Sequence, residues 1–191
     1  MSNCWYNIKI DTQDPFNPKW KFPDVPFTGY GIWFIPAQDV FSQQWLSYVS
    51  SLGLDLVHTM IFYRGPYQST RFAHLDLKSG NPFIINHFAI NWVIDGIGSE
   101  MFWYKKPPEK FEVMWTSAKT PYVQWKKNEL EMIDRCAIKN NMTLVNVGIP
   151  HSVTVTEQGR WCISVRTSDD DDLPWDQIVE KMRKLNLLIE R

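Results

Sequence analysis

The chain has 191 residues, a length that normally folds as one domain. Its 20 basic and 21 acidic residues give a net charge of −1, which argues against a general nucleic-acid binder, because such a protein needs a basic surface to displace phosphate counterions. The same balance argues against a polybasic membrane-surface protein. Hydrophobic residues at 44% and charged residues at 21% exclude extensive disorder.

The content of aromatic residues and proline favours a β-rich domain. The chain contains 10 Trp, its aromatic residues reach 15%, and 12 Pro accompany only 9 Gly. This composition indicates many short elements joined by rigid corners, which is typical of sandwiches and barrels.

Three cysteines, Cys4, Cys136 and Cys162, are unevenly spaced. An odd number without regular spacing does not fit a disulfide framework, so we expect reduced thiols and a cytoplasmic location, with the Cys4 thiol exposed near the terminus. The sequence shows neither a signal-peptide pattern nor an apolar run long enough to span a membrane, so we expect a soluble protein.

The first part of the chain predicts an irregular arm followed by a helix. Residues 1–38 contain five prolines, which favour an arm with a short strand over a helix. This aromatic-rich arm is also the surface we expect to be used if the protein forms a homodimer. Asp39 is expected to cap a helix that ends at Gly53, so residues 1–53 form the arm plus helix.

From residue 54 to residue 167, short apolar runs alternate with turn signals, which predicts a β core. The segment Pro121–Asn141 fits either a helix or a strand, and the turn Glu157–Gly159 predicts a hairpin between the last two strands. The expected strands are Leu54–Phe62, Phe72–Leu77, Ile84–Ile94, Glu100–Tyr104, Phe111–Trp115, Thr143–Val147, His151–Thr156 and Arg160–Thr167.

The last part, residues 168–191, predicts a C-terminal helix. The acidic run Ser168–Asp172 is interpreted as a solvated boundary, and Pro174 is expected at the first helical position. Because no linker or repeat interrupts the chain, we predict a single domain over residues 1–191.

Two histidines and one aspartate form the strongest chemical pattern. His74 and Asp76 lie two residues apart in an expected strand, so their side chains point to the same face. His151 follows Pro150 at the start of a later strand. Two imidazoles and one carboxylate on one side of an octahedral metal leave three positions open, which suits non-haem Fe(II).

A second pattern lies on the expected strand that follows His151. Arg160, Cys162, Ser164 and Arg166 share one face because side chains alternate along a strand. A buried arginine needs an anion, and its planar guanidinium matches a carboxylate with two parallel hydrogen bonds. A metal site with a nearby buried arginine indicates an acid that chelates the metal at one end and is clamped at the other.

The order His74-x-Asp76, then His151, then Arg160 nine residues later resembles Fe(II)- and 2-oxoglutarate-dependent oxygenases, in particular their prolyl- and aspartyl-hydroxylase-like branch. The resemblance covers roughly residues 55–167. It implies a double-stranded β-helix (jelly roll, cupin-like) with flanking helices. It also implies Fe(II) held by His74, Asp76 and His151, and 2-oxoglutarate bound through its distal carboxylate by Arg160. The implied reaction is hydroxylation of a substrate coupled to conversion of 2-oxoglutarate to succinate.

The chain departs from this family's pattern beside the arginine. Many members have Ser two residues after it, whereas this chain has Cys162 there and Ser164 two residues further on. The assignment of the clamp therefore stays open between Arg160 and Arg166, and we favour Arg160. Asn91 and Ser164 are further candidates for contact with the co-substrate, and Asn91 fits equally well as an amide satisfied within its strand.

Two alternative functions remain. The first is a cupin-like metalloprotein that acts as an isomerase or dioxygenase without 2-oxoglutarate. The second is a non-enzymatic jelly roll that binds a glycan or a protein partner through exposed tryptophans. The sequence leaves the substrate open, either a small molecule or a peptide. Four residues before the metal strand are interpreted as an entrance lid: Tyr63, Arg64, Tyr67 and Arg71.

Overall fold

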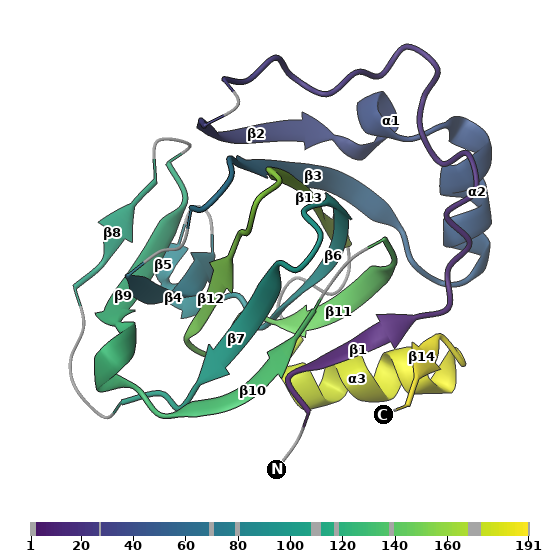
Figure 1. The fold of residues 1–191 in the computed structure, drawn as a ribbon. Coiled ribbons are helices and arrows are strands. Elements are labelled where there is room, and N and C mark those ends of the chain that lie inside the picture. Colours follow the sequence, from purple (N-terminus) through teal and green to yellow (C-terminus); the bar gives the residue numbers. More distant parts are fainter. Residues whose placement is uncertain are drawn as a thin grey trace.

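The structure is a computed structural model that describes residues 3–26, 28–68, 71–78, 81–107, 112–116, 119–137, 140–167 and 173–190. The chain is mainly β, as the sequence predicts. Its strands form two sheets that face each other, and the pairings between the described strands are antiparallel (Figure 1).

The first sheet is centred on its longest pairings, those of β13 with β3 on one side and β6 on the other. In spatial order its strands are β14 (Leu188–Ile189), β1 (Trp5–Ile8), β11 (Met142–Asn146), β6 (Phe88–Asp95), β13 (Arg160–Thr167), β3 (Leu56–Arg64) and β2 (Tyr30–Pro36).

The second sheet faces the inner side of the first. In spatial order its strands are β10 (Met132–Cys136), β7 (Glu100–Tyr104), β12 (His151–Thr154), β4 (Phe72–Lys78), β9 (Pro121–Lys126) and β8 (Met114–Trp115), and β5 (Asn81–Ile85) also pairs with β4.

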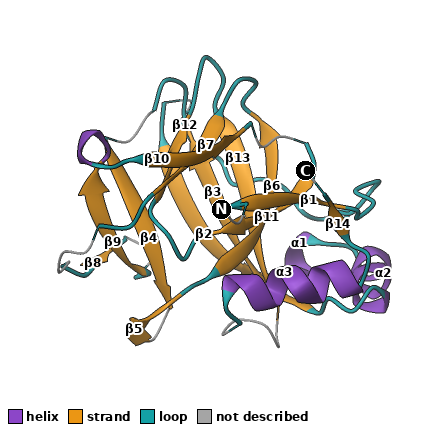
Figure 2. Cartoon of the chain, turned by 90° about the horizontal axis from the view of Figure 1, so that it is seen from below, coloured by secondary structure: helices purple, strands orange, loops and turns teal. Residues whose placement is uncertain are grey.

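The α-helices cover the first sheet on the side away from the second sheet (Figures 1 and 2). They are α1 (Ala37–Val40), α2 (Gln43–Ser51) and α3 (Trp175–Lys184), and a 3-10 segment η1 (Lys127–Glu129) follows β9. Trp45 of α2 and Met182 of α3 are buried in one apolar cluster with Ile163 of β13. This cluster is the main core of the protein.

A smaller apolar cluster lies between the two sheets. Trp103 of β7 is fully buried there, and its indole N–H donates to the carbonyl of Asn146 (2.7 Å). Cys4, Cys136 and Cys162 all belong to this cluster, and none of the three forms a disulfide among the described residues. The expected exposure of Cys4 is wrong, because Cys4 directly precedes β1, which is paired into the first sheet.

The expected single helix after Asp39 is divided into α1 and α2. Phe41 leaves the helical conformation to make an isolated bridge with Phe16, and Ser42 caps α2 by accepting a hydrogen bond from the Trp45 backbone N–H (3.2 Å). The serine, not Asp39, is therefore the cap. The helix ends just before Gly53, as expected, and that glycine has a φ of +88°.

Other strand boundaries differ from the predictions in informative ways. The expected strand Ile84–Ile94 is interrupted by Asn86 and His87, and the backbone N–H of Asn86 donates to the carbonyl of Asp76 (3.0 Å). The ambiguous segment Pro121–Asn141 forms strands β9 and β10.

The expected hairpin at Glu157–Gly159 is wrong. Strand β12 pairs with β4 and β7 in the second sheet, whereas β13 pairs with β3 and β6 in the first. The chain therefore crosses from one sheet to the other between these strands. As a consequence, His151 and Arg160 approach the space between the sheets from opposite walls.

The terminal segments contribute more strands than expected. Strands β1 and β2 come from the arm, and β14 follows the C-terminal helix, so all three extend the first sheet. The acidic run Ser168–Asp172 lies outside the described residues, and Pro174 is the N-cap of α3 rather than its first helical residue. Among the described residues, no helix combines the length and apolar character needed to cross a membrane.

Candidate metal centre and its cleft

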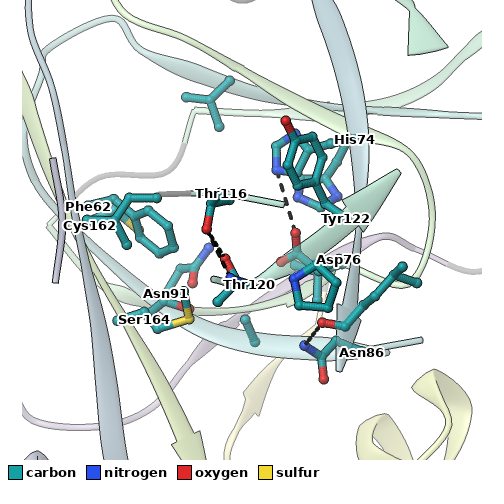
Figure 3. A pocket seen from close by; sticks show the side chains of 18 of the residues that line it. Phe62, His74, Asp76, Asn86, Asn91, Thr116, Thr120, Tyr122, Cys162 and Ser164 are labelled. Atoms are coloured by element: carbon teal, nitrogen blue, oxygen red, sulfur yellow. Dashed lines mark hydrogen bonds and ion pairs between the residues drawn. The ribbon is translucent and has the colours of Figure 1, made fainter. Parts of the chain in front are cut away.

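A cleft of about 690 Å³ lies between the two sheets, a size that matches small-molecule sites. Side chains from the inner faces of both sheets line its walls. Figure 3 shows Phe62 and Cys162 of the first sheet on one side of this space, and His74 and Tyr122 of the second sheet on the other. The cleft is therefore the place where the chemistry-bearing residues of both sheets meet.

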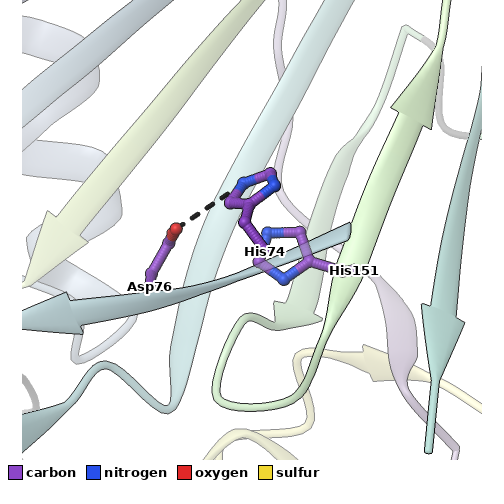
Figure 4. A group of neighbouring side chains, drawn as sticks. All are labelled: His74, Asp76 and His151. Atoms are coloured by element: carbon purple, nitrogen blue, oxygen red, sulfur yellow. Dashed lines mark ion pairs between the residues drawn. The ribbon is translucent and has the colours of Figure 1, made fainter. Parts of the chain in front are cut away.

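His74, Asp76 and His151 meet on one wall of this cleft (Figure 4). His74 and Asp76 point to the same side of β4 because they are two residues apart, and His151 is the direct partner of His74 on β12. One ligand atom from each side chain lies within 4.8 Å of the others, and the two imidazole rings are 4.3 Å apart between centroids. This spacing suits three ligands of one metal ion.

Both histidines are held in the neutral form that metal ligation requires. Burial and the neighbouring His151 together lower the pKa of His74 to about 3, against the opposing effect of Asp76. Burial also lowers the pKa of His151. The Nδ1 of His151 lies 3.0 Å from the carbonyl of Ile149, which can only accept a hydrogen bond. The proton therefore sits on Nδ1, and Nε2 is available as a ligand.

The carboxylate of Asp76 lies between a histidine and an arginine. Its Oδ1 is 3.7 Å from Nε2 of His74, and its Oδ2 is 4.0 Å from Nη2 of Arg166. The Nη1 of Arg166 donates to the backbone carbonyl of Phe88. Arg166 is thus fixed to the first sheet and orients the carboxylate of Asp76 from across the cleft.

Arg160 is in a different situation from Arg166. Its residue surface is only 5% exposed, and its Nη1 is buried without a hydrogen-bond partner among the described residues. Burial lowers its pKa, and the neighbouring Cys162 acts in the opposite direction. A buried guanidinium nitrogen without a partner is costly, because its desolvation is not compensated. This atom is therefore suited to an anionic ligand.

The predicted inner face of β13 lines the cleft as expected. Arg160, Cys162, Ser164 and Arg166 all contribute to its wall, and Asn91 of the neighbouring strand β6 does so too. The side-chain oxygen of Asn91 is buried without a hydrogen-bond partner among the described residues. The interpretation of Asn91 as an amide satisfied within its strand is therefore not supported.

The expected entrance lid does not form as a unit. Tyr63 is buried on the outer face of β3 and packs against Trp161, whereas Arg64 points into the cleft and Tyr67 is exposed. Sequence reasoning also missed Tyr30 of β2 and Tyr122 of β9, which line the cleft. Alternation along β3 was the available signal for Arg64, because His58, Met60, Phe62 and Arg64 share one face.

The donor set fits a divalent transition metal. Two neutral imidazoles and one carboxylate are the ligands of open non-haem iron sites. Arg160, whose buried Nη1 has no hydrogen-bond partner among the described residues, lines the same cleft.

Comparison with known proteins assigns the chain to no family. No family profile matches the chain, and no curated protein matches its sequence. Among solved structures, the chain is similar to Peruvianin-I, described as a cysteine peptidase from Thevetia peruviana latex. The sequences are 13% identical, the TM-score is 0.36, and the match covers 83% of this chain and 76% of that one. At this level the similarity carries no argument about the fold or the function.

Proposed function

We propose that the protein is a jelly roll that binds Fe(II) and 2-oxoglutarate and hydroxylates an organic substrate. In this proposal Fe(II) is held by His74, Asp76 and His151, and the distal carboxylate of 2-oxoglutarate pairs with Arg160. The observation that carries it is the combination of a three-ligand metal set with a partnerless buried guanidinium nitrogen in one cleft.

The strand order supports the jelly-roll part of the proposal. Strands β3, β6, β11 and β13 belong to the first sheet, and β4, β7, β10 and β12 belong to the second. The chain crosses from one sheet to the other several times, from β3 to β4, from β6 to β7, and at each step from β10 through β11 and β12 to β13. Two antiparallel sheets connected in this way are typical of jelly rolls and cupins.

The environment of the arginines supports Arg160, rather than Arg166, as the clamp. The partners of Arg166 already include the carboxylate of Asp76 and the carbonyl of Phe88. Arg160 has a buried donor, Nη1, without a hydrogen-bond partner among the described residues. A bidentate carboxylate would satisfy this donor and its charge together. Arg166 is then a positioning residue for Asp76.

The residues of the chain have simple roles in this reaction. Bound Fe(II) supplies the redox chemistry by which 2-oxoglutarate and O₂ yield succinate and CO₂, with the second oxygen atom appearing as the hydroxyl group of the product. His74, Asp76 and His151 keep three coordination positions open, and Arg160 orients the co-substrate. Asn91 and Ser164 offer hydrogen bonds along the wall between these groups. No side chain needs to act as a general base.

The test is the reaction without added substrate, since enzymes of this chemistry can turn over the co-substrate alone. The protein is incubated with Fe(II), ascorbate, O₂ and 2-oxoglutarate, and succinate is measured against the His151→Ala variant. We expect succinate from the parent protein and none above background from the variant, with unchanged circular dichroism in both. Metal binding without affinity for 2-oxoglutarate would favour the cupin-like alternative. Absence of metal binding would favour a non-enzymatic binding protein.

A further inference from the structure

We infer that Arg64 and Tyr30 form a binding site for an anionic group, a carboxylate or phosphate, on the primary substrate. The inference rests on the proposed function in one respect, because it takes the molecule bound here to be the one that is oxidised. It adds a substrate class, which the metal site and the co-substrate clamp leave open.

Arg64 lies between the deep end of the cleft and its edge. It pairs in register with Arg160 on the central strand β13 and with Tyr30 on the edge strand β2. Arg160 is 5% exposed and Tyr30 is 49% exposed, so the row Arg160, Arg64, Tyr30 leads from the interior to solvent. Arg64 is therefore the cation that a ligand entering from this edge meets before the co-substrate clamp.

The guanidinium of Arg64 packs against an aromatic ring, and no carboxylate of the described residues pairs with it. Its Cζ lies 5.3 Å from the centroid of the Tyr30 ring, within the range of cation–π contacts. Among the described residues, no acidic side chain forms an ion pair with Arg64. Burial and the nearby Arg160 both lower the pKa of Arg64, against the effect of Tyr30. The Tyr30 ring covers one face of the Arg64 guanidinium and leaves the N–H groups at its edge for a ligand.

The charge of the cleft favours an anion. Its described lining carries four basic side chains, Arg64, Lys78, Arg160 and Arg166, and one carboxylate, Asp76. That carboxylate is already close to Arg166. A divalent cation adds further positive charge, which one dicarboxylate co-substrate does not fully balance. An anionic substrate therefore complements the positive charge that remains in the cleft.

Aromatic rings at the cleft edge indicate the rest of the substrate. Phe34 of β2 is 59% exposed and Trp115 of β8 is 54% exposed, and both line the cleft. Phe72 and Tyr122 extend this aromatic wall on the second sheet. Exposed rings on both sides of an opening suit a flat or apolar body. The substrate class is thus an aromatic or apolar molecule that carries a carboxylate or phosphate.

The test uses the full chain loaded with Mn(II) and 2-oxoglutarate, with benzoate, phenyl phosphate and benzyl alcohol as probes. Binding of each probe is measured by calorimetry in the parent protein, Arg64→Met and Lys127→Met. The last variant is the matched control, because Lys127 is a half-buried cation outside the cleft lining, and burial together with the nearby Arg64 lowers its pKa.

We expect benzoate or phenyl phosphate to bind the parent protein and Lys127→Met alike, and Arg64→Met at least about tenfold more weakly. The probe that binds more tightly identifies the anion as carboxylate or phosphate. The neutral benzyl alcohol should show no difference between Arg64→Met and the parent protein. The affinity for 2-oxoglutarate should change by less than about threefold in Arg64→Met, because that ligand pairs with Arg160.

Two results would overturn the inference. One is equal binding of the anionic probes to Arg64→Met and the parent protein, or no saturable binding to either. The other is a large loss of 2-oxoglutarate affinity in Arg64→Met, which would assign Arg64 to the co-substrate. If Mn(II) and 2-oxoglutarate do not bind at all, the proposed function fails instead. Binding of the anionic probes that depends on Arg64 would then still establish the anion site.

Discussion

The two faces of the first sheet differ sharply although the same strands form both. On the outer face of β13, Ile163 and Val165 are fully buried against the helices. On the inner face of the same strand, Arg160 and Arg166 line the cleft. Because side chains alternate along a strand, one segment of eight residues supplies the core and the candidate chemistry separately. Substitutions on the two faces should therefore have separable effects on stability and binding.

The largest expected effect on stability comes from the outer face. Ile163→Ala should lower the free energy of unfolding by about 3 kcal/mol, because it leaves a cavity in the main core. Urea denaturation measures the loss, and Val57→Ala, at a half-exposed position on β3, serves as a control with an expected change below about 0.5 kcal/mol. Mn(II) affinity of folded Ile163→Ala should change by less than about threefold. A similar loss of stability in both variants would contradict the assignment of the core.

On the inner face, Arg160→Ala should weaken the binding of 2-oxoglutarate to the Mn(II)-loaded protein by about 30-fold. The protein should not lose stability, since the substitution removes a buried cation whose Nη1 has no partner among the described residues. Calorimetry gives the first quantity and urea denaturation the second. Unchanged affinity for 2-oxoglutarate would remove Arg160 from the proposed site.

Arg166→Ala should produce a smaller effect of a different kind. Because Arg166 orients the carboxylate of Asp76, its loss should reduce Mn(II) affinity by about tenfold. The affinity for 2-oxoglutarate, measured at saturating Mn(II), should fall much less than in Arg160→Ala. The reverse pattern in the two variants would transfer the clamp to Arg166.

The pH dependence of stability sharpens the comparison further. The pKa of His74 is about 3 in the folded protein, below the ordinary value of 6.5, so the unfolded chain binds the proton more readily. In the metal-free protein, the His74 imidazole should therefore not lower the free energy of unfolding above about pH 6.5. It should lower that free energy progressively as the pH falls toward 3.

The slope due to one such proton is at most about 1.4 kcal/mol per pH unit, and His74→Gln should remove it. Urea denaturation of the metal-free parent protein and variant at pH 6.5, 5.5 and 4.5 measures the difference. Parallel slopes would show that His74 is not held neutral by its surroundings.

Local patterns predicted the elements better than their assembly. The strand Arg160–Thr167 has the bounds that its alternation indicates, and the two-residue spacing places His74 and Asp76 on one face. The hairpin between β12 and β13 was wrong because a turn signal does not reveal whether the chain continues in the same sheet or crosses to the opposite one. That choice depends on which strands are already paired.

The same limit applies to the missed cleft residues. Arg64 is recognisable as inward-facing from the alternation of β3, but its neighbour Tyr30 comes from the arm, 34 positions earlier. Prolines in that arm suggested an irregular segment, whereas Tyr30–Pro36 pairs with β3 along its length. Edge strands tolerate proline because one side of their backbone needs no partner, so the prolines did not exclude a strand here.

The proposed site, in which His74, Asp76 and His151 hold iron that binds 2-oxoglutarate, is tested most directly by spectroscopy. Fe(II) and then 2-oxoglutarate are added to the metal-free protein without oxygen, while the visible spectrum is recorded. We expect a metal-to-ligand charge-transfer band that saturates with 2-oxoglutarate and is absent in Asp76→Ala. Bound iron without such a band, or an equal band in Asp76→Ala, would contradict the proposed site.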